Sequence, residues 1–65
     1  MDVGGYTVRT VPWRLGWELH VDGVGVTQCT KLADAEDVTR DFLDALDYAD
    51  AHTAEVWILT SPPHA

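Results

Sequence analysis

The spacing of apolar residues changes once along the chain, near Leu32. Before this point apolar and polar residues alternate, as in Trp17 to Val21 (WELHV), which predicts a β-strand with one apolar face. After it apolar residues recur every three or four positions, which predicts an amphipathic α-helix. A chain with both patterns is expected to pack one helix against a sheet of short strands.

Asp22-Gly23 separates the alternating segment from a second one. These two residues favour a two-residue type I′ hairpin turn. The turn predicts that Val21 lies opposite Val24, Leu19 opposite Val26 and Trp17 opposite Gln28, with the apolar residues on one face. It also predicts the polar pairs His20 with Gly25 and Glu18 with Thr27. A loop of four residues that includes Gly25 is the alternative.

Two further strands flank this hairpin and the helix. The first, residues 6–11 (YTVRTV), is rich in β-branched residues, and Pro12 is expected to end it. The last is residues 55–59 (EVWIL), which Ser61-Pro62-Pro63 follows. The sequence therefore predicts an α+β domain of order β-β-β-α-β, with an antiparallel sheet and the helix on one face.

The helix is predicted from Leu32 to a point before His52, with His52 near its C-terminal end as a cap. Its predicted apolar and acidic faces are opposite one another. The apolar face consists of Ala35, Val38, Phe42, Leu46 and Ala49, and the acidic face of Asp37, Asp41, Asp44 and Asp47.

A chain of 65 residues and 7.2 kDa allows one small domain, residues 1–65. We expect an ordered core over residues 5–59 and a flexible tail over 60–65. Asp and Glu number 11 against 4 Lys and Arg, which gives a net charge of −7. Such a chain repels polyanions, so direct binding to DNA or RNA is not expected.

The single cysteine, Cys29, cannot form an internal disulfide, which favours a reducing compartment. Neither a signal peptide nor an apolar run long enough to span a membrane is recognisable. A cytoplasmic protein without a membrane segment is therefore expected.

The polar residues do not predict catalysis. His20, His52 and His64 lack the spacing of metal ligands, and no cofactor motif is present. Glu18 and Asp22 are the carboxylates that could join the helix aspartates in a two-metal site. Because the helix aspartates are predicted to diverge on a solvated face, we expect no catalytic, metal or cofactor site. Cys29 is expected to be a small buried residue.

The tryptophans predict an interaction surface. Trp17 is expected in the core, whereas Trp57 is expected on the opposite face of the sheet if Val56 and Ile58 point inward. An exposed tryptophan on a small sheet is a candidate interface residue. It favours self-association, most simply as a two-fold homodimer.

Two segments carry a resemblance to a known family. GVGVTQ (residues 23–28), followed by Leu32 and then AEDVTRD (residues 35–41), is similar to small actinobacterial HicB-like proteins. In those proteins a tryptophan-bearing strand leads into a "PGV-x-TQ" turn, and an "R-D" pair lies within the following helix. The similarity covers about Tyr6 to Ile58. The turn departs from the family, because Asp22-Gly23-Val24-Gly25 stands where the family often has Pro-Gly.

The resemblance implies a partial RNase H-like or swapped double-stranded-RNA-binding-like fold. It also implies a non-enzymatic antitoxin that neutralises a HicA-like toxin, a small basic ribonuclease. Asp37, Asp41, Asp44 and Trp57 are the residues expected to bind this partner. The chain ends six residues after Leu59. The operator binding that a DNA-binding domain gives most HicB antitoxins is therefore not expected from the resemblance. The alternative is a small homo-oligomeric structural or regulatory protein without a toxin partner.

Overall fold

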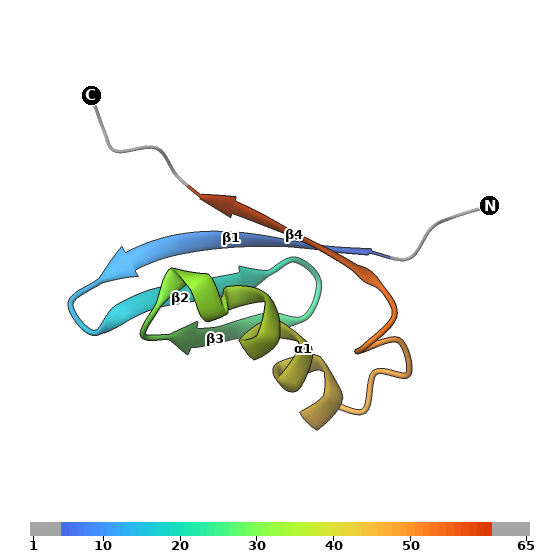
Figure 1. Ribbon diagram of the computed structural model, residues 1–65. Helices are drawn as coiled ribbons and strands as arrows, with labels where there is room; N and C mark the ends of the chain where they lie inside the picture. Colours follow the sequence, from blue (N-terminus) through green and yellow to red (C-terminus); the bar gives the residue numbers. More distant parts are fainter. Residues whose placement is uncertain (1–4, 61–65) are drawn as a thin grey trace.

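A single helix covers one face of a four-stranded sheet in the computed structural model, which describes residues 5–60 (Figure 1). The strands are β1 (Gly5–Trp13), β2 (Gly16–Val21), β3 (Gly25–Cys29) and β4 (Glu55–Thr60). A short 3-10 helix, η1 (Leu32–Asp34), leads directly into α1 (Ala35–Ala45). The α+β class, the β-β-β-α-β order and the single helix confirm the fold class expected from the sequence.

The sheet is mixed, with strand order β3-β2-β1-β4. The first three strands form the expected antiparallel meander, but β4 runs parallel to β1, from Gly5 opposite Glu55 to Thr10 opposite Thr60. Since β1 and β3 have the same direction, a helix that runs back along the sheet brings β4 out parallel to both. The expectation of an antiparallel sheet therefore holds for the meander and not for β4.

The β2–β3 turn has three residues, not the two that were predicted. The amide of Val24 donates a hydrogen bond to the carbonyl of Val21 at 3.0 Å, and Gly23 has a φ of +78° while that of Asp22 is not positive. A type I′ turn would need a positive φ at both central residues. The strand register is consequently shifted by one residue.

In the observed register Val21 lies opposite Gly25, Leu19 opposite Thr27, and Trp17 opposite Cys29. The predicted pairs, including His20 with Gly25, are therefore wrong. His20 and Glu18 do lie on the sheet face away from the helix, as expected, but opposite Val26 and Gln28.

In this register Gly25 lies under the ring of Phe42 of α1. A Cβ added to Gly25 would lie 3.4 Å from Cζ of the Phe42 ring, so the ring packs directly on the glycine. Because side chains alternate along a strand, Gly25 on the helix-covered face places Val26 on the other face. Val26 is accordingly 53% exposed, although it was predicted to be in the core.

The core lies between α1 and the two central strands. Val8 of β1, Leu19 of β2 and Leu43 of α1 are fully buried. Along the helix the buried line is Ala35, Thr39 and Leu43. Ala35 was correctly predicted to be a core residue. Leu46 was also predicted on the apolar face of the helix, but it is 48% exposed.

The helix ends earlier than predicted, at Ala45, in a Schellman-type cap. Tyr48 donates its amide to the Leu43 carbonyl at 3.0 Å, and Asp47 donates its amide to the Asp44 carbonyl at 2.9 Å. Asp47 has a φ of +65°, the left-handed conformation that turns the chain out of the helix. Ala49 and Asp47 therefore lie outside the helix, contrary to the prediction.

His52 does not cap the helix. It lies exposed in the α1–β4 connection, and its Nε2 is 3.9 Å from Oδ2 of Asp44. The predicted interaction of a His52 cation with the C-terminal carbonyls of a longer helix is therefore wrong.

Two side chains hold the connection between α1 and β4 in place. Arg40 donates hydrogen bonds from Nη1 to the carbonyls of Ala51 and Ala54, at 3.2 and 2.9 Å. Tyr6 of β1 donates its hydroxyl to Oδ1 of Asp50 at 2.8 Å. The connection is thereby joined both to α1 and to β1, and it brings the chain to the start of β4.

The first and last strands also differ from their predicted bounds. Strand β1 continues through Pro12, which pairs with Trp17 of β2. Thr10 is the last residue of β1 that pairs with β4, so Pro12 lies beyond that pairing. The missing N–H of Pro12 therefore costs no bond to β4. Of the predicted flexible tail, Thr60 belongs to β4. Residues 61–65, including His64, lie outside the described residues.

Candidate functional site

Three aspartates of α1 form an exposed surface that we name the acidic face: Asp37, Asp41 and Asp44. Their spacing of four and three residues places them on one side of the helix, as predicted. Asp44 lies near His52, and no lysine or arginine within residues 5–60 forms a salt bridge with any of the three. The carboxylates of the acidic face are thus not paired with a lysine or arginine among the described residues.

Arg40 is the one basic residue of α1, and it does not neutralise the acidic face. Its side chain is 21% exposed and forms a salt bridge with Oε2 of Glu36 at 2.9 Å from Nη2. Its Nε also donates to Oε2 of Glu36, at 3.1 Å, and Nη1 donates to the two loop carbonyls described above. The arginine of the "R-D" pair therefore has a structural role, and only the aspartate of that pair, Asp41, faces solvent.

Trp57 lies on the other side of the molecule. It belongs to β4 and is 46% exposed, while its neighbours Val56 and Ile58 pack against the core from the helix-covered face. The tryptophan therefore emerges on the face without the helix, as predicted. A Cβ added to Gly5 would overlap the indole ring, which shows that Trp57 lies flat across Gly5.

The four residues expected to bind one partner therefore divide between two surfaces. The helix α1 covers one face of the sheet (Figure 1), and the acidic face is exposed on it, whereas Trp57 of β4 is exposed on the other face of the sheet. The structure brings the three aspartates together and does not bring Trp57 to them.

The sheet face without the helix, which we name the open face, carries apolar residues that the sequence analysis did not single out. Leu59 is 50% exposed and Val11 39%. Leu59 follows Trp57 on the same face of β4, and Val11 lies on β1, two residues beyond Arg9, the partner of Leu59. The open face is thus apolar along β4 and the adjoining part of β1.

The middle of the open face is charged. Arg9 Nε lies 3.6 Å from Oδ1 of Asp22, and His20 Nε2 lies 3.0 Å from Oε1 of Glu18. The first pair joins β1 to the β2–β3 turn, and the second lies within β2, so these side chains have partners within the chain. Alternation along the strands was enough to predict that Glu18 and His20 share this face.

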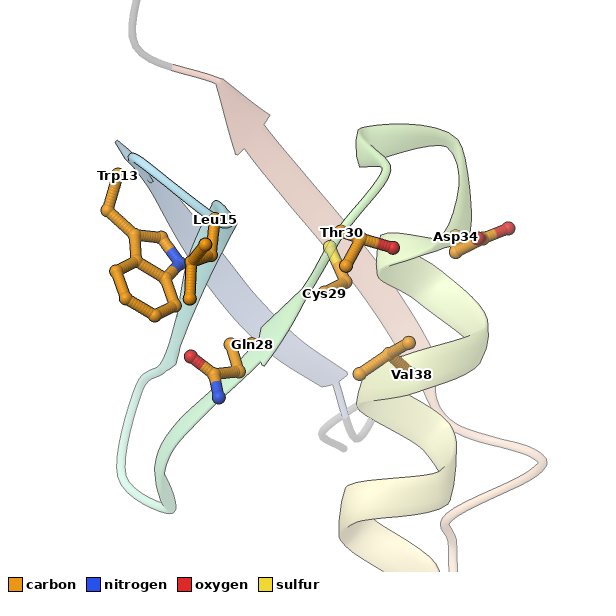
Figure 2. Close-up of a pocket in the computed structure, with 7 residues that line it drawn as sticks. All are labelled: Trp13, Leu15, Gln28, Cys29, Thr30, Asp34 and Val38. Carbon is orange, nitrogen blue, oxygen red and sulfur yellow. The ribbon is translucent and has the colours of Figure 1, made fainter.

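A pocket of about 370 Å³ opens at one end of the sheet, where the β1–β2 turn, the end of β3 and the start of α1 meet (Figure 2). Trp13 and Leu15 lie on one side of it, Val38 on the other, and Cys29 between them. No histidine, lysine or arginine lines this pocket within the described residues. Its lining therefore offers no basic side chain that could stabilise a thiolate, and its one ionisable neighbour of Cys29 is the acidic Asp34.

Cys29 is buried, as predicted. Burial, together with the negative charge of Asp34, raises the pKa of its thiol above the usual value. A raised pKa lowers the fraction of thiolate at neutral pH, and the thiolate is the nucleophilic form. The environment of Cys29 is that of a packed core residue.

The carboxylates do not converge on a metal-binding cleft. Within residues 5–60 no group of three or more His, Cys, Asp or Glu side chains is close enough to hold a metal ion. Glu18 and Asp22 pair with His20 and Arg9 on the open face, far from the acidic face on α1.

In the part of the chain that the structure describes, α1 is too short to cross a membrane. Comparison of the chain with protein families, with curated proteins and with solved structures found no match. The resemblance to HicB-like proteins therefore stays a prediction.

Proposed function

We propose that this chain is a non-enzymatic protein-binding domain that uses the acidic face to bind and neutralise a small basic protein. The observation that carries the proposal is the combination of three exposed aspartates with an inward-facing Arg40. A helix with i,i+3 and i,i+4 acids usually gains from balancing cations on its surface. Here the one cation of α1 is directed to the loop, so the charge remains available to a partner.

Electrostatics favours a basic partner over a neutral one. The seven acids from Asp34 to Asp50 lie on or beside α1 with Arg40 as their sole cation, whereas the open face carries both signs of charge. A field concentrated on one side steers a basic protein to that side and raises its association rate. Binding of this kind weakens as the salt concentration rises.

A HicA-like ribonuclease toxin is the partner class that the resemblance to HicB-like proteins suggests. A protein whose site binds the phosphates of RNA is basic there, and a row of carboxylates can occupy such a site in place of RNA. The proposed activity is therefore inhibition by occupation in the cytoplasm, with no chemical step by this chain.

The experiment is a pull-down from the native host at low salt with the tagged full chain, followed by purification of the captured protein and an RNA-cleavage assay. The proposal predicts a small basic protein that salt releases and whose ribonuclease activity falls to zero at a stoichiometric amount of this chain. A captured protein without ribonuclease activity, or one that stays active when bound, would contradict the toxin assignment.

A matched pair of variants tests the surface. We expect Asp37→Asn, Asp41→Asn and Asp44→Asn together to weaken binding by about tenfold or more, because each removes one exposed charge from the acidic face. The control is Asp22→Asn, Asp47→Asn and Glu55→Gln, which changes the net charge equally, from −7 to −7 + 3 = −4. Equal weakening by both variants would show that only net charge matters and would remove the acidic face from the proposal.

A homo-oligomeric structural or regulatory protein is the second candidate function. The observation that favours it is the exposure of Trp57 and Leu59 on β4, away from the acidic face. A pull-down that returns only this chain, with no basic protein, would support this candidate.

A further inference from the structure

Strand β4 is an edge strand with apolar side chains on both of its faces. It pairs with β1 on one side, and no described residue pairs with it on the other. Trp57 and Leu59 are 46% and 50% exposed on the open face, and Val56 and Ile58 are only partly buried on the helix side. Apart from Glu55 at its start, the strand has no charged residue.

This edge lacks the features that keep exposed strands from pairing. Natural proteins protect such edges with lysines, prolines, bulges or covering segments, since the free N–H and C=O groups otherwise accept another strand. Within β4 there is no lysine, arginine or proline, and its six residues pair with β1 in unbroken register. The edge is therefore suited to strand addition.

The open face as a whole is less suited to an interface. Packing two open faces together would bury Arg9, Asp22, Glu18 and His20, which lie in its middle. Removing charged pairs from water costs more than their mutual attraction returns in many cases. Contact along β4 leaves these side chains in solvent and still covers Trp57 and Leu59.

We propose that β4 pairs antiparallel with β4 of a second copy of this chain about a two-fold axis, which joins the two sheets into one of eight strands. Antiparallel neighbours share a face, so a register centred on Ile58 places Trp57 of one copy beside Leu59 of the other. Val56 then lies opposite Thr60, and Glu55 of each copy falls outside these pairs, so no carboxylates meet. The strand is thus complementary to itself.

A second copy fits this edge better than a charged partner does, because the edge offers no charge to pair. The helix aspartates are exposed and belong to α1, not to β4, so each copy keeps its acidic face exposed in the dimer. The inference uses a different surface from the proposed binding of a basic protein, and it specifies the contact through which the second candidate, a homo-oligomer, would form. It adds that a basic partner would meet two acidic faces in one assembly.

The dimer is expected to dissociate on dilution. A contact of one six-residue strand from each copy is about 20 Å long and covers less than the roughly 800 Å² per partner of a standard interface. Sedimentation of the full chain over a wide concentration range should therefore show a mass rising from 7.2 kDa towards twice that value.

The decisive variant is Leu59→Lys, which places a charge on the edge at a half-exposed position. We expect it to weaken dimerisation by about 30-fold or more, the loss typical of a central interface residue. The matched control is Val26→Lys, on the same face and similarly exposed, but on the opposite edge strand. It should leave dimerisation unchanged.

Hydrogen exchange of the unmodified chain gives a second readout that does not depend on how a variant folds. The proposal predicts that β4 amides gain protection as the chain concentration rises, while β3 amides do not. A wild-type chain that stays monomeric at millimolar concentration would overturn the proposal. Equal loss of the dimer in Leu59→Lys and Val26→Lys would also overturn it, because that result would indicate packing through the open face. Protection of β3 amides that rises with concentration would overturn it as well.

Discussion

Asp47 holds a conformation that glycine adopts more readily. It lies at the position after the helix cap with a φ of +65°, and the two hydrogen bonds of the cap depend on that conformation. An L-residue with a side chain pays roughly 1–2 kcal/mol there, less for aspartate than for most others. The negative charge is also unfavourable near the carbonyl end of a helix.

We therefore expect Asp47→Gly to raise the free energy of unfolding by about 1 kcal/mol. Urea unfolding followed by circular dichroism measures this, with the slope of the transition unchanged. Asp47→Ala is the control, because it removes the charge but keeps the conformational cost. If Asp47→Ala stabilises the chain as much as Asp47→Gly does, loss of the charge and not the backbone conformation causes the stabilisation.

Tyr6 is the residue whose ionisation should affect folding at high pH. Its hydrogen bond to Asp50, together with partial burial, raises the pKa of the phenol above 10.0. Above pH 10 the unfolded chain loses this proton while the folded chain retains it. The stabilisation is therefore complete below the unfolded pKa and is lost as the pH rises through the folded one.

Thermal unfolding should consequently show a midpoint that falls as the pH rises from about 9 to about 11. Tyr6→Phe should have a lower midpoint at neutral pH and a shallower decline. Parallel curves for the two proteins would mean that the ionisation of Tyr6 does not cause the decline.

At the scale of elements, α1 and the α1–β4 connection are held together by Arg40. Its guanidinium satisfies the carbonyls of Ala51 and Ala54, and both of these alanines are buried. Without the guanidinium the two carbonyls lose their donor, and an unsatisfied buried acceptor costs about 1–3 kcal/mol.

Arg40→Ala is expected to lower the free energy of unfolding by about 2 kcal/mol or more. Arg40→Lys should lower the free energy of unfolding by less than Arg40→Ala does. It should still be less stable than the unmodified chain, because a single ammonium cannot reproduce the planar arrangement of guanidinium donors. The neighbouring Asp41→Ala is the control, and as an exposed substitution it should change stability by less than about 0.5 kcal/mol. A loss for Arg40→Ala within that range would contradict the role of Arg40 in holding the connection.

The elements were predictable from local patterns, and their exact bounds and register were not. Alternation and the Asp22-Gly23 pair identify the hairpin, yet these two residues suit a turn of two or of three residues. The observed three-residue turn places Gly25 under the ring of Phe42, a contact between residues distant in sequence that local patterns do not reveal. The helix end was missed for a similar reason, because Asp47 adopts the conformation that a glycine usually signals.

At the scale of the whole molecule, the fold class could be predicted, and so could the exposure of Trp57 on the face away from the helix. The packing of α1 against one face of the sheet follows from the single apolar face of the helix. The split between the acidic face and Trp57 depends on which face β4 turns outward and on how far α1 extends over the sheet. The parallel pairing of β4 could have been derived, since both edges of the meander have the same direction.

The pairing of the first strand with the last sets the order in which the sheet can be completed. Gly5 lies beside Glu55, 55 − 5 = 50 residues later in the chain. During synthesis the meander and α1 emerge first, and one edge of the central strand β1 has no partner until β4 leaves the ribosome. Contacts this distant in sequence slow folding. Closure of the sheet is therefore a late step, and until it occurs the nascent chain presents an unpaired central strand to its surroundings.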